Sequence, residues 1–361
     1  MSDLPIRDEL RGLSPYGAPQ LDVPVRLNTN ENPFEPPRDF VEALSATVLE
    51  AAKTLNRYPD RDALQLRSAL AAYLERESAT AGITAEQIWV GNGSNEVMLH
   101  ILQAFGGPGR KALSFVPTYS MYEEYARDTF TEFVTVPRSA EFTVDVEAAV
   151  AAVRSVQPHV VFLASPNNPT GTAQDLALIP ELLRAFDGMV VVDEAYAEFR
   201  RDGVPSAVSL VHLHPRLIVT RTMSKAFGFA GARVGYLMAH ADVVDALRVV
   251  RLPYHLSTIT QAVAITALQH ATELRAQVSV LREERDALVD WFHANGYVTT
   301  PSDANFVMFG LFDDRHAVWQ GLVDEGVLVR EVGPSGYLRV SVGTTAEMAR
   351  FREALMKVGR T

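Results

Sequence analysis

The chain of 361 residues contains no cysteine. This absence excludes thiol catalysis, disulfide bonds and thiolate metal sites together. The nine histidines also lack the His-Glu-x-x-His spacing of a helical zinc site. We therefore expect no metal site.

Long apolar runs are missing as well. No uninterrupted apolar stretch reaches the roughly 18 residues that predict a transmembrane helix. The first ten residues mix charges with apolar side chains and do not form a secretory apolar core. We expect a cytoplasmic protein without a membrane partner. The net charge of −11 also argues against a large nucleic-acid surface.

Lysine is scarce, because only four of the 33 basic residues are lysines. One of them, Lys225, lies in the stretch Thr-Met-Ser-Lys-Ala-Phe-Gly-Phe-Ala-Gly-Ala-Arg-Val-Gly at positions 222–235. Its apolar neighbours favour a partly dry setting, which disfavours the charged amine and suits Schiff-base chemistry. Thr222, Ser224 and Arg233 offer hydroxyl and guanidinium donors for a phosphate. The stretch predicts a site for a phosphorylated aldehyde, and a solvated surface lysine is the alternative.

Short apolar runs alternate with helical patterns between about residues 87 and 240. The runs are 88–90, 113–116, 160–163, 190–192 and 217–219. This pattern predicts an α/β fold, with a mainly parallel sheet covered by helices. We expect an N-terminal arm at 1–35 that joins a small domain, a large domain at 36–255, and a small α+β domain at 256–361.

Ligands of such sheets bind beyond the carboxyl ends of the strands. There the sequence places a glycine turn that opens a helix at 91–96, an asparagine, Asn168, and a carboxylate, Asp193. A glycine turn at a helix start suits a phosphate, although alone it is a weak signal. The sequence has neither the third glycine of the dinucleotide fingerprint nor a P-loop. A buried Asp193 needs a partner, and a pyridinium nitrogen would supply one.

Asn168, Asp193 and Lys225 follow three successive strand runs. Together they offer a donor for a phenolic oxygen, a partner for a ring nitrogen and an amine that captures an aldehyde. This combination predicts pyridoxal 5′-phosphate as the cofactor.

Six motifs carry a family resemblance along nearly the whole chain. Ser-Pro-Asn-Asn-Pro-Thr-Gly, Val-Asp-Glu-Ala-Tyr and the lysine stretch resemble the fold-type I pyridoxal-phosphate aminotransferases. Asn-Glu-Asn-Pro-Phe, Asn-Arg-Tyr-Pro-Asp and Gly-Asn-Gly-Ser-Asn-Glu are similar, within that family, to histidinol-phosphate aminotransferases.

The resemblance implies a role for each matching residue. Lys225 would bind the cofactor and shuttle a proton, with Asp193 and Tyr196 as further catalytic residues. The residues implied to bind the cofactor are Ser94, Asn95, Tyr119, Asn168, Asp193, Tyr196, Thr222, Ser224, Lys225 and Arg233, with Tyr58 reaching the phosphate from a second subunit. The residues implied to bind substrate are Tyr16, Asn30, Tyr254, Arg330 and Arg339. Arg330 is equally compatible with a solvated surface position.

The expected reaction is amino transfer between L-histidinol phosphate and 2-oxoglutarate in histidine biosynthesis, by a homodimer. An aromatic amino-acid aminotransferase and an amino-acid-phosphate decarboxylase are the alternatives, since either would keep Lys225, Asp193 and Asn168. A cofactor-binding regulator of DNA is disfavoured, because the chain has no basic segment for one.

Overall fold

The computed structural model describes residues 4–359. Its largest sheet has seven strands in the order β2-β8-β7-β6-β5-β3-β4. Their bounds are β2 Ile88–Asn92, β3 Lys111–Val116, β4 Glu132–Pro137, β5 Val160–Ala164, β6 Met189–Asp193, β7 Leu217–Thr222 and β8 Val234–Met238. β4, β3, β5, β6 and β7 are mutually parallel, and β8 is antiparallel to both β7 and β2. The predicted α/β fold with a mainly parallel sheet is confirmed.

All five predicted strand runs form strands of this sheet, and β4 and β8 are additional. β4 lies at the sheet edge and has no buried residue, so its apolar signal is weak. β8 is fully buried, but it begins inside the lysine stretch, at Val234, and it contains Gly235. Glycine is uncommon inside strands, which hides β8 in the sequence.

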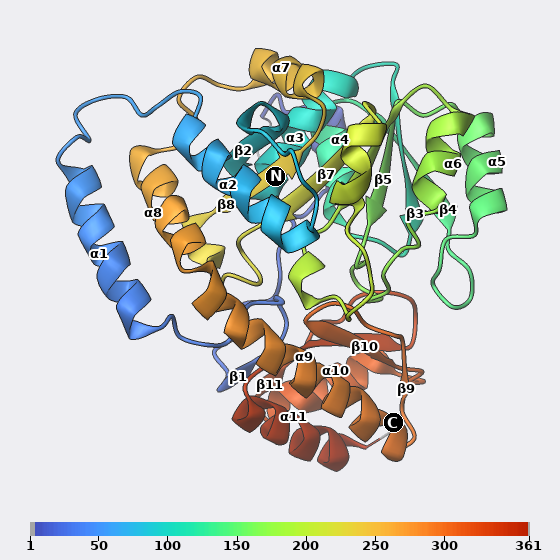
Figure 1. Ribbon diagram of the computed structural model, residues 1–361. Coiled ribbons are helices and arrows are strands. Elements are labelled where there is room, and N and C mark those ends of the chain that lie inside the picture. Colours follow the sequence, from blue (N-terminus) through green and yellow to red (C-terminus); the bar gives the residue numbers. More distant parts are fainter. Residues whose placement is uncertain (1–3, 360–361) are drawn as a thin grey trace.

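Helices cover both faces of the sheet (Figure 1). Alternate residues of β5 enter two separate cores, with Val161 and Leu163 in one and Val160 and Phe162 in the other. The first core includes residues of α2 (Leu64–Ser78), α5 (Val146–Val156), α6 (Leu178–Ala185) and α8 (Thr258–Gln269). The second includes residues of α3 (Ser94–Phe105), α4 (Met121–Asp128) and α7 (Ala241–Val250). Helix α1 (Arg38–Ala52) packs on α8. Burial on both faces explains the continuous apolar runs of the central strands.

A smaller unit lies at one end of the large sheet (Figure 1). It has an antiparallel sheet in the order β12-β10-β9, and a parallel pair of β1 with β11. The strands are β1 Val25–Arg26, β9 Val298–Thr299, β10 Phe306–Gly310, β11 Val327–Leu328 and β12 Tyr337–Ser341. The helices are α9 Ala271–Ala294, α10 Arg315–Asp324 and α11 Thr345–Val358. Short 3₁₀ helices lie at Asp8–Leu10, Ala85–Gln87, Ala197–Phe199, Ala207–Leu213 and Ala230–Ala232.

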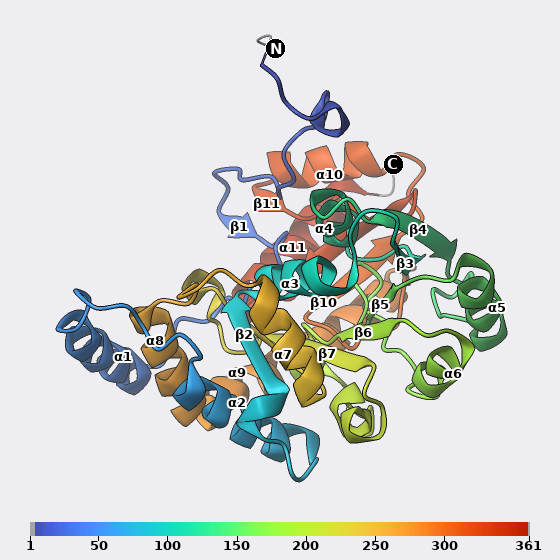
Figure 2. The same cartoon turned by 90° about the horizontal axis from the view of Figure 1, so that it is seen from above.

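The N-terminal segment runs along the smaller unit before the chain enters α1. Its strand β1 pairs with β11, so residues 25–26 lie beside residues 327–328. Figure 2 shows the segment before β1 extending away from the sheet. The division at 1–35, 36–255 and 256–361 stays a prediction. Because α8 packs against α1 and α2, we propose moving the second boundary into α9.

The parallel strands β5, β6 and β7 end side by side. Ala164 is the register partner of Asp193, and Asp193 is the partner of Thr220. The segments that follow these strands therefore meet at one edge of the sheet, where it faces the smaller unit. None of the helices within residues 4–359 combines the length and apolar composition needed to cross a membrane.

Candidate active site

A cavity of about 260 Å³ lies at this edge. Fourteen of the predicted site residues line it, which are Tyr16, Asn30, Ser94, Asn95, Tyr119, Asn168, Asp193, Tyr196, Thr222, Ser224, Lys225, Arg233, Arg330 and Arg339. Tyr58 and Tyr254 do not. The cavity is also lined by residues that the sequence did not single out, among them Asn28, Thr29, Thr118 and Ser120.

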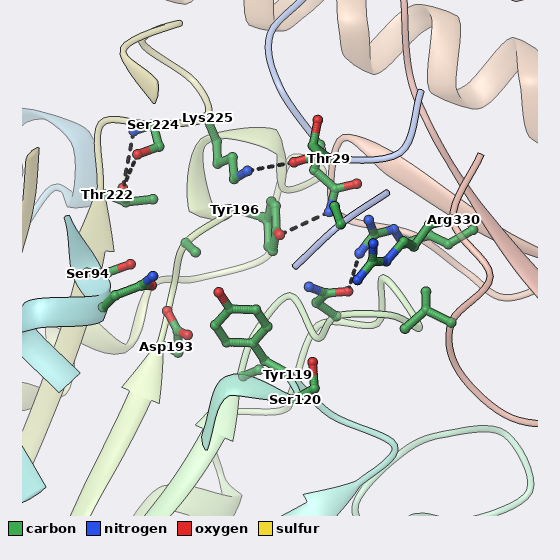
Figure 3. Close-up of a pocket in the computed structure, with 18 of the residues that line it drawn as sticks. Thr29, Ser94, Tyr119, Ser120, Asp193, Tyr196, Thr222, Ser224, Lys225 and Arg330 are labelled. Carbon is green, nitrogen blue, oxygen red and sulfur yellow. Dashed lines mark hydrogen bonds between the residues drawn. The ribbon is translucent and has the colours of Figure 1, made fainter. Parts of the chain in front are cut away.

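Lys225 points into the cavity from the loop after β7 (Figure 3). Its Nζ donates a hydrogen bond to the backbone oxygen of Thr29 at 2.9 Å. Burial lowers the pKa of Lys225 to about 8, and the positive charges of Arg339 and Arg233 act in the same direction. A lowered pKa makes the neutral, nucleophilic amine available near neutral pH.

Asp193 ends β6 and is buried at the floor of the cavity. The hydroxyl of Tyr122 donates to its Oδ2 at 2.9 Å, and that of Thr220 donates to its Oδ1 at 3.1 Å. Burial raises the pKa of Asp193 to about 6, and the two hydroxyl donors oppose this shift. Tyr122 and Thr220 were not predicted, although Thr220 lies two residues before Thr222 and therefore on the same face of β7.

The start of α3 packs closely against β8. Gly93 has φ +80°, and a Cβ added there would lie 2.6 Å from Nη2 of Arg233. A Cβ at Gly235 would lie only 2.1 Å from the backbone nitrogen of Ser94. Nearby, the hydroxyl of Thr222 donates to Ser224 Oγ at 3.0 Å. Backbone N–H groups at the helix start, two hydroxyls and a guanidinium thus form a cradle that suits a phosphate.

Arg339 of β12 lies at the opposite end of the cavity. Its Nη1 donates to Oδ1 of Asn168 at 2.6 Å, and its Nη2 donates to the backbone oxygen of Asn28 at 2.7 Å. Burial lowers the pKa of Arg339 to about 10, and the neighbouring charge of Arg330 acts in the same direction, so Arg339 stays charged at neutral pH.

Arg330 lies beside this group and donates to the backbone oxygen of Gly17 at 3.2 Å. Figure 3 shows Arg330 on one side of Tyr119, with Ser94, Thr222 and Ser224 on the other. Among residues 4–359, neither Nη1 of Arg330 nor Nε of Arg339 has a hydrogen-bond partner, and both atoms are buried. The cavity therefore has hydrogen-bond donors that suit an anion at each end.

Asn30 connects the N-terminal segment to both units of the fold. It has φ +55°, and its Nδ2 donates to the hydroxyl of Tyr196 at 3.0 Å. Its backbone N–H donates to Ser341 Oγ at 2.8 Å, and Asn305 donates to its backbone oxygen at 3.1 Å. Because these contacts occupy Asn30, the structure makes it a support for Tyr196 as well as a wall of the cavity.

Tyr58 and Tyr254 stack on each other outside the cavity. Their ring centres are 4.5 Å apart and their planes are inclined by 16°. The exposed fractions of Tyr58 and Tyr254 are 81% and 41%. The role implied for Tyr58 in a second subunit stays a prediction, as does the substrate contact of Tyr254.

The donor set fits pyridoxal phosphate at each of its reactive groups. The cradle around Ser94 and Arg233 suits the phosphate, and Lys225 suits the aldehyde. Asp193, which has no cationic side chain among the groups that act most strongly on its pKa, suits a protonated ring nitrogen.

Within residues 4–359, no group of three or more acidic or histidine side chains could hold a metal ion.

Comparison with known proteins agrees with a site for pyridoxal phosphate. Residues 23–355 match the family described as aminotransferase class I and II. The chain is 62% identical to a histidinol-phosphate aminotransferase of Thermobifida fusca, over 99% of this chain and 96% of that protein. It is 57% identical to histidinol-phosphate aminotransferase 3 of Burkholderia lata, over 99% and 96%. The chain belongs to the histidinol-phosphate aminotransferases, within the class I and II aminotransferases.

A solved relative supports this membership. The crystal structure of the histidinol-phosphate aminotransferase of Sinorhizobium meliloti, in complex with pyridoxal 5′-phosphate, superposes with a TM-score of 0.83. It is 26% identical and covers 93% of this chain and 91% of that chain. Membership confirms the predicted enzyme class, a pyridoxal-phosphate-dependent aminotransferase, and its cofactor.

Proposed function

We propose that the chain transfers an amino group between L-histidinol phosphate and 2-oxoglutarate, giving imidazole-acetol phosphate and L-glutamate in histidine biosynthesis. The observation that carries this proposal is the pair of arginines, Arg330 and Arg339. Each has one buried N–H group without a partner among residues 4–359, at the end of the cavity remote from the phosphate cradle. The names of the relatives at 62% and 57% identity support the same substrate.

Two guanidinium groups suit both substrates of this reaction. A carboxylate and a phosphate monoester each accept a planar pair of N–H donors. Glutamate and histidinol phosphate can therefore use one anchor in turn, with Arg339 buried and Arg330 beside it. Tyr16 and Ala18 line the same end, and the contact of Arg330 with Gly17 holds this segment near the cavity.

The remaining residues hold the cofactor and move protons. We assign the cofactor phosphate to Ser94, Asn95, Thr222, Ser224 and Arg233, and the ring face to Tyr119. When bound, pyridoxal phosphate supplies an electron sink for the electron pair that the substrate carbon releases. The carboxylate of Asp193 would hold a proton on the ring nitrogen, and Asn168 and Tyr196 would donate to the ring hydroxyl oxygen.

Lys225 acts as the base and acid of the reaction. With the cofactor bound, the neutral Nζ of Lys225 would accept the proton from the substrate carbon that bears the amino group. The same amine would then donate a proton on the return. A pKa lowered to about 8 suits both directions, since a group that exchanges protons works best near the ambient pH.

We further propose a homodimer in the cytoplasm. The stacked residues Tyr58 and Tyr254 have exposed apolar side chains near them in sequence, including Leu55, Val249 and Leu252, whose exposed fractions are 53%, 83% and 76%. Exposed apolar patches of this kind commonly mark subunit contacts. In a dimer, Tyr58 would donate to the cofactor phosphate of the partner. Light scattering measures whether the protein is a dimer. Tyr58→Phe should weaken cofactor binding and leave the dimer intact.

The choice of substrate is tested by offering purified enzyme several amino donors with 2-oxoglutarate. We expect kcat/KM for histidinol phosphate to exceed that for phenylalanine. Faster turnover of phenylalanine would favour the aromatic aminotransferase. Release of carbon dioxide without formation of glutamate would favour the decarboxylase.

A further inference from the structure

The carboxylate of Asp193 is held by two hydroxyl groups from different elements. Tyr122, near the start of α4, donates to Oδ2 at 2.9 Å. Thr220 of β7 donates to Oδ1 at 3.1 Å. Each oxygen thus has a neutral donor, so the carboxylate has a fixed orientation before any ligand binds.

Packing leaves the Tyr122 ring little freedom. The side chain is fully buried, and its ring stacks on Phe162 of β5 with centres 4.7 Å apart. The ring of Tyr119, which lines the cavity, meets it edge-on at 5.6 Å. Burial raises the pKa of Tyr122 well above its usual range, with the charge of Asp193 acting in the same direction. Tyr122 therefore keeps its proton and acts only as a donor to Asp193.

A hydrogen bond to a carboxylate favours its charged form. If Asp193 lost a donor, its carboxylate would become more basic and would compete more strongly for the proton that it shares with a ring nitrogen. The ring would then carry less positive charge and accept electrons less readily. The hydroxyl of Tyr122 thus acts on the cofactor without touching it.

We propose that Tyr122 is a positioning residue, whose hydroxyl keeps Asp193 ionised and oriented so that the shared proton resides on the ring nitrogen of the cofactor. This inference rests on the role of Asp193 proposed above. Thr220 supports the same carboxylate from the other side.

Tyr122→Phe is the sharpest test, because it removes one oxygen and keeps the stacked ring. Tyr236→Phe is the matched control. Tyr236 is also buried in the large domain, but it lies in the core on the other face of the sheet. Its hydroxyl has no hydrogen-bond partner among residues 4–359.

The measurement is the ¹⁵N chemical shift of the ring nitrogen in holoenzyme reconstituted with ¹⁵N-labelled pyridoxal phosphate. We expect a protonated nitrogen in the wild type and in Tyr236→Phe, and a shift toward unprotonated pyridine in Tyr122→Phe. The dissociation constant of the cofactor should rise about tenfold in Tyr122→Phe alone, the scale of a hydrogen bond to a charged group. We expect kcat with glutamate to fall by a similar factor.

The possible outcomes distinguish a failure of the role of Tyr122 from a failure of the role of Asp193. A folded Tyr122→Phe enzyme with the wild-type ¹⁵N shift overturns the role of Tyr122. An unprotonated nitrogen in the wild type overturns the role of Asp193 and this inference with it. If Tyr122→Phe does not fold, Thr220→Val removes the other donor and must move the ¹⁵N shift in the same direction, and an unchanged shift there also contradicts the proposal.

Discussion

Arg339 donates a hydrogen bond from Nη1 to Oδ1 of Asn168 over 2.6 Å. This contact joins β12 of the smaller unit to the loop after β5 of the large sheet. Because the guanidinium takes the amide oxygen, the amide nitrogen of Asn168 is the group left to donate to a ligand. The residue proposed to anchor the substrate therefore also orients a residue proposed to contact the cofactor.

Replacing Arg339 by lysine should raise KM for both glutamate and histidinol phosphate. Lysine keeps the charge but cannot give a planar pair of donors, and it cannot hold Asn168 and Asn28 together. We expect a rise of about tenfold to a hundredfold, from the 1.5–3 kcal/mol typical of a hydrogen bond to a charged group. Steady-state kinetics with each substrate measures this rise in KM.

Arg330→Lys is the control for this substitution. Arg330 lies nearer to solvent, and among residues 4–359 the side chain of Arg330 donates a hydrogen bond only to the backbone oxygen of Gly17. We expect a smaller rise in KM, of about fivefold, from the roughly 1 kcal/mol of an ionic contact close to solvent. A larger effect for Arg330→Lys than for Arg339→Lys would mean that the main anchor has been misplaced.

Gly235→Ala should abolish cofactor binding and destabilise the protein. The new Cβ would meet the backbone nitrogen of Ser94 at 2.1 Å, so the start of α3 must move away from β8. Overpacking of this kind costs about 1–3 kcal/mol, and a backbone contact that cannot yield costs more. Thermal unfolding and cofactor absorbance measure both effects. Gly231→Ala has open space at its Cβ and should change neither.

The stability of the apoprotein should depend on the ionisation of Asp193. Burial raises its pKa to about 6, above the ordinary value of 3.8. The stabilisation that protonated Asp193 contributes to the folded protein is therefore fully present below pH 3.8, the ordinary pKa, and is lost as the pH rises through about 6. Between about pH 5 and 7.5, we expect wild-type apoprotein to lose about 1 kcal/mol more unfolding free energy than Asp193→Asn, at about 1.4 kcal/mol for each pKa unit. Urea titrations across this range test it, and equal losses in the two proteins would contradict a raised pKa.

The sequence predicted the large sheet and the edge at which the site lies. Asn168, Asp193 and Lys225 each follow an apolar run, and parallel strands bring their ends together. Lys225 and Arg233 were also recognisable locally, because an isolated lysine with apolar neighbours lies close in sequence to hydroxyl and guanidinium donors that suit a phosphate. The α/β class and the candidate cavity both follow from these short signals.

Contacts that depend on tertiary geometry were not predictable. Tyr122 reaches Asp193 from a helix 71 positions away in sequence, and its only local signal is its spacing of three residues from Tyr119. Asn30 has a left-handed backbone conformation that lets it bond to Tyr196, Ser341 and Asn305, and nothing around it in sequence indicates those partners. The stacking of Tyr58 on Tyr254 likewise joins two distant loops.

The central claim is that Lys225 is the residue that binds the cofactor covalently. Borohydride reduction of the holoenzyme, followed by peptide mapping, tests it most directly. We predict loss of the visible absorbance, with the reduced label on the peptide that contains Lys225. The account is contradicted if the label lies on another residue, or if Lys225→Ala protein still forms the reduced adduct.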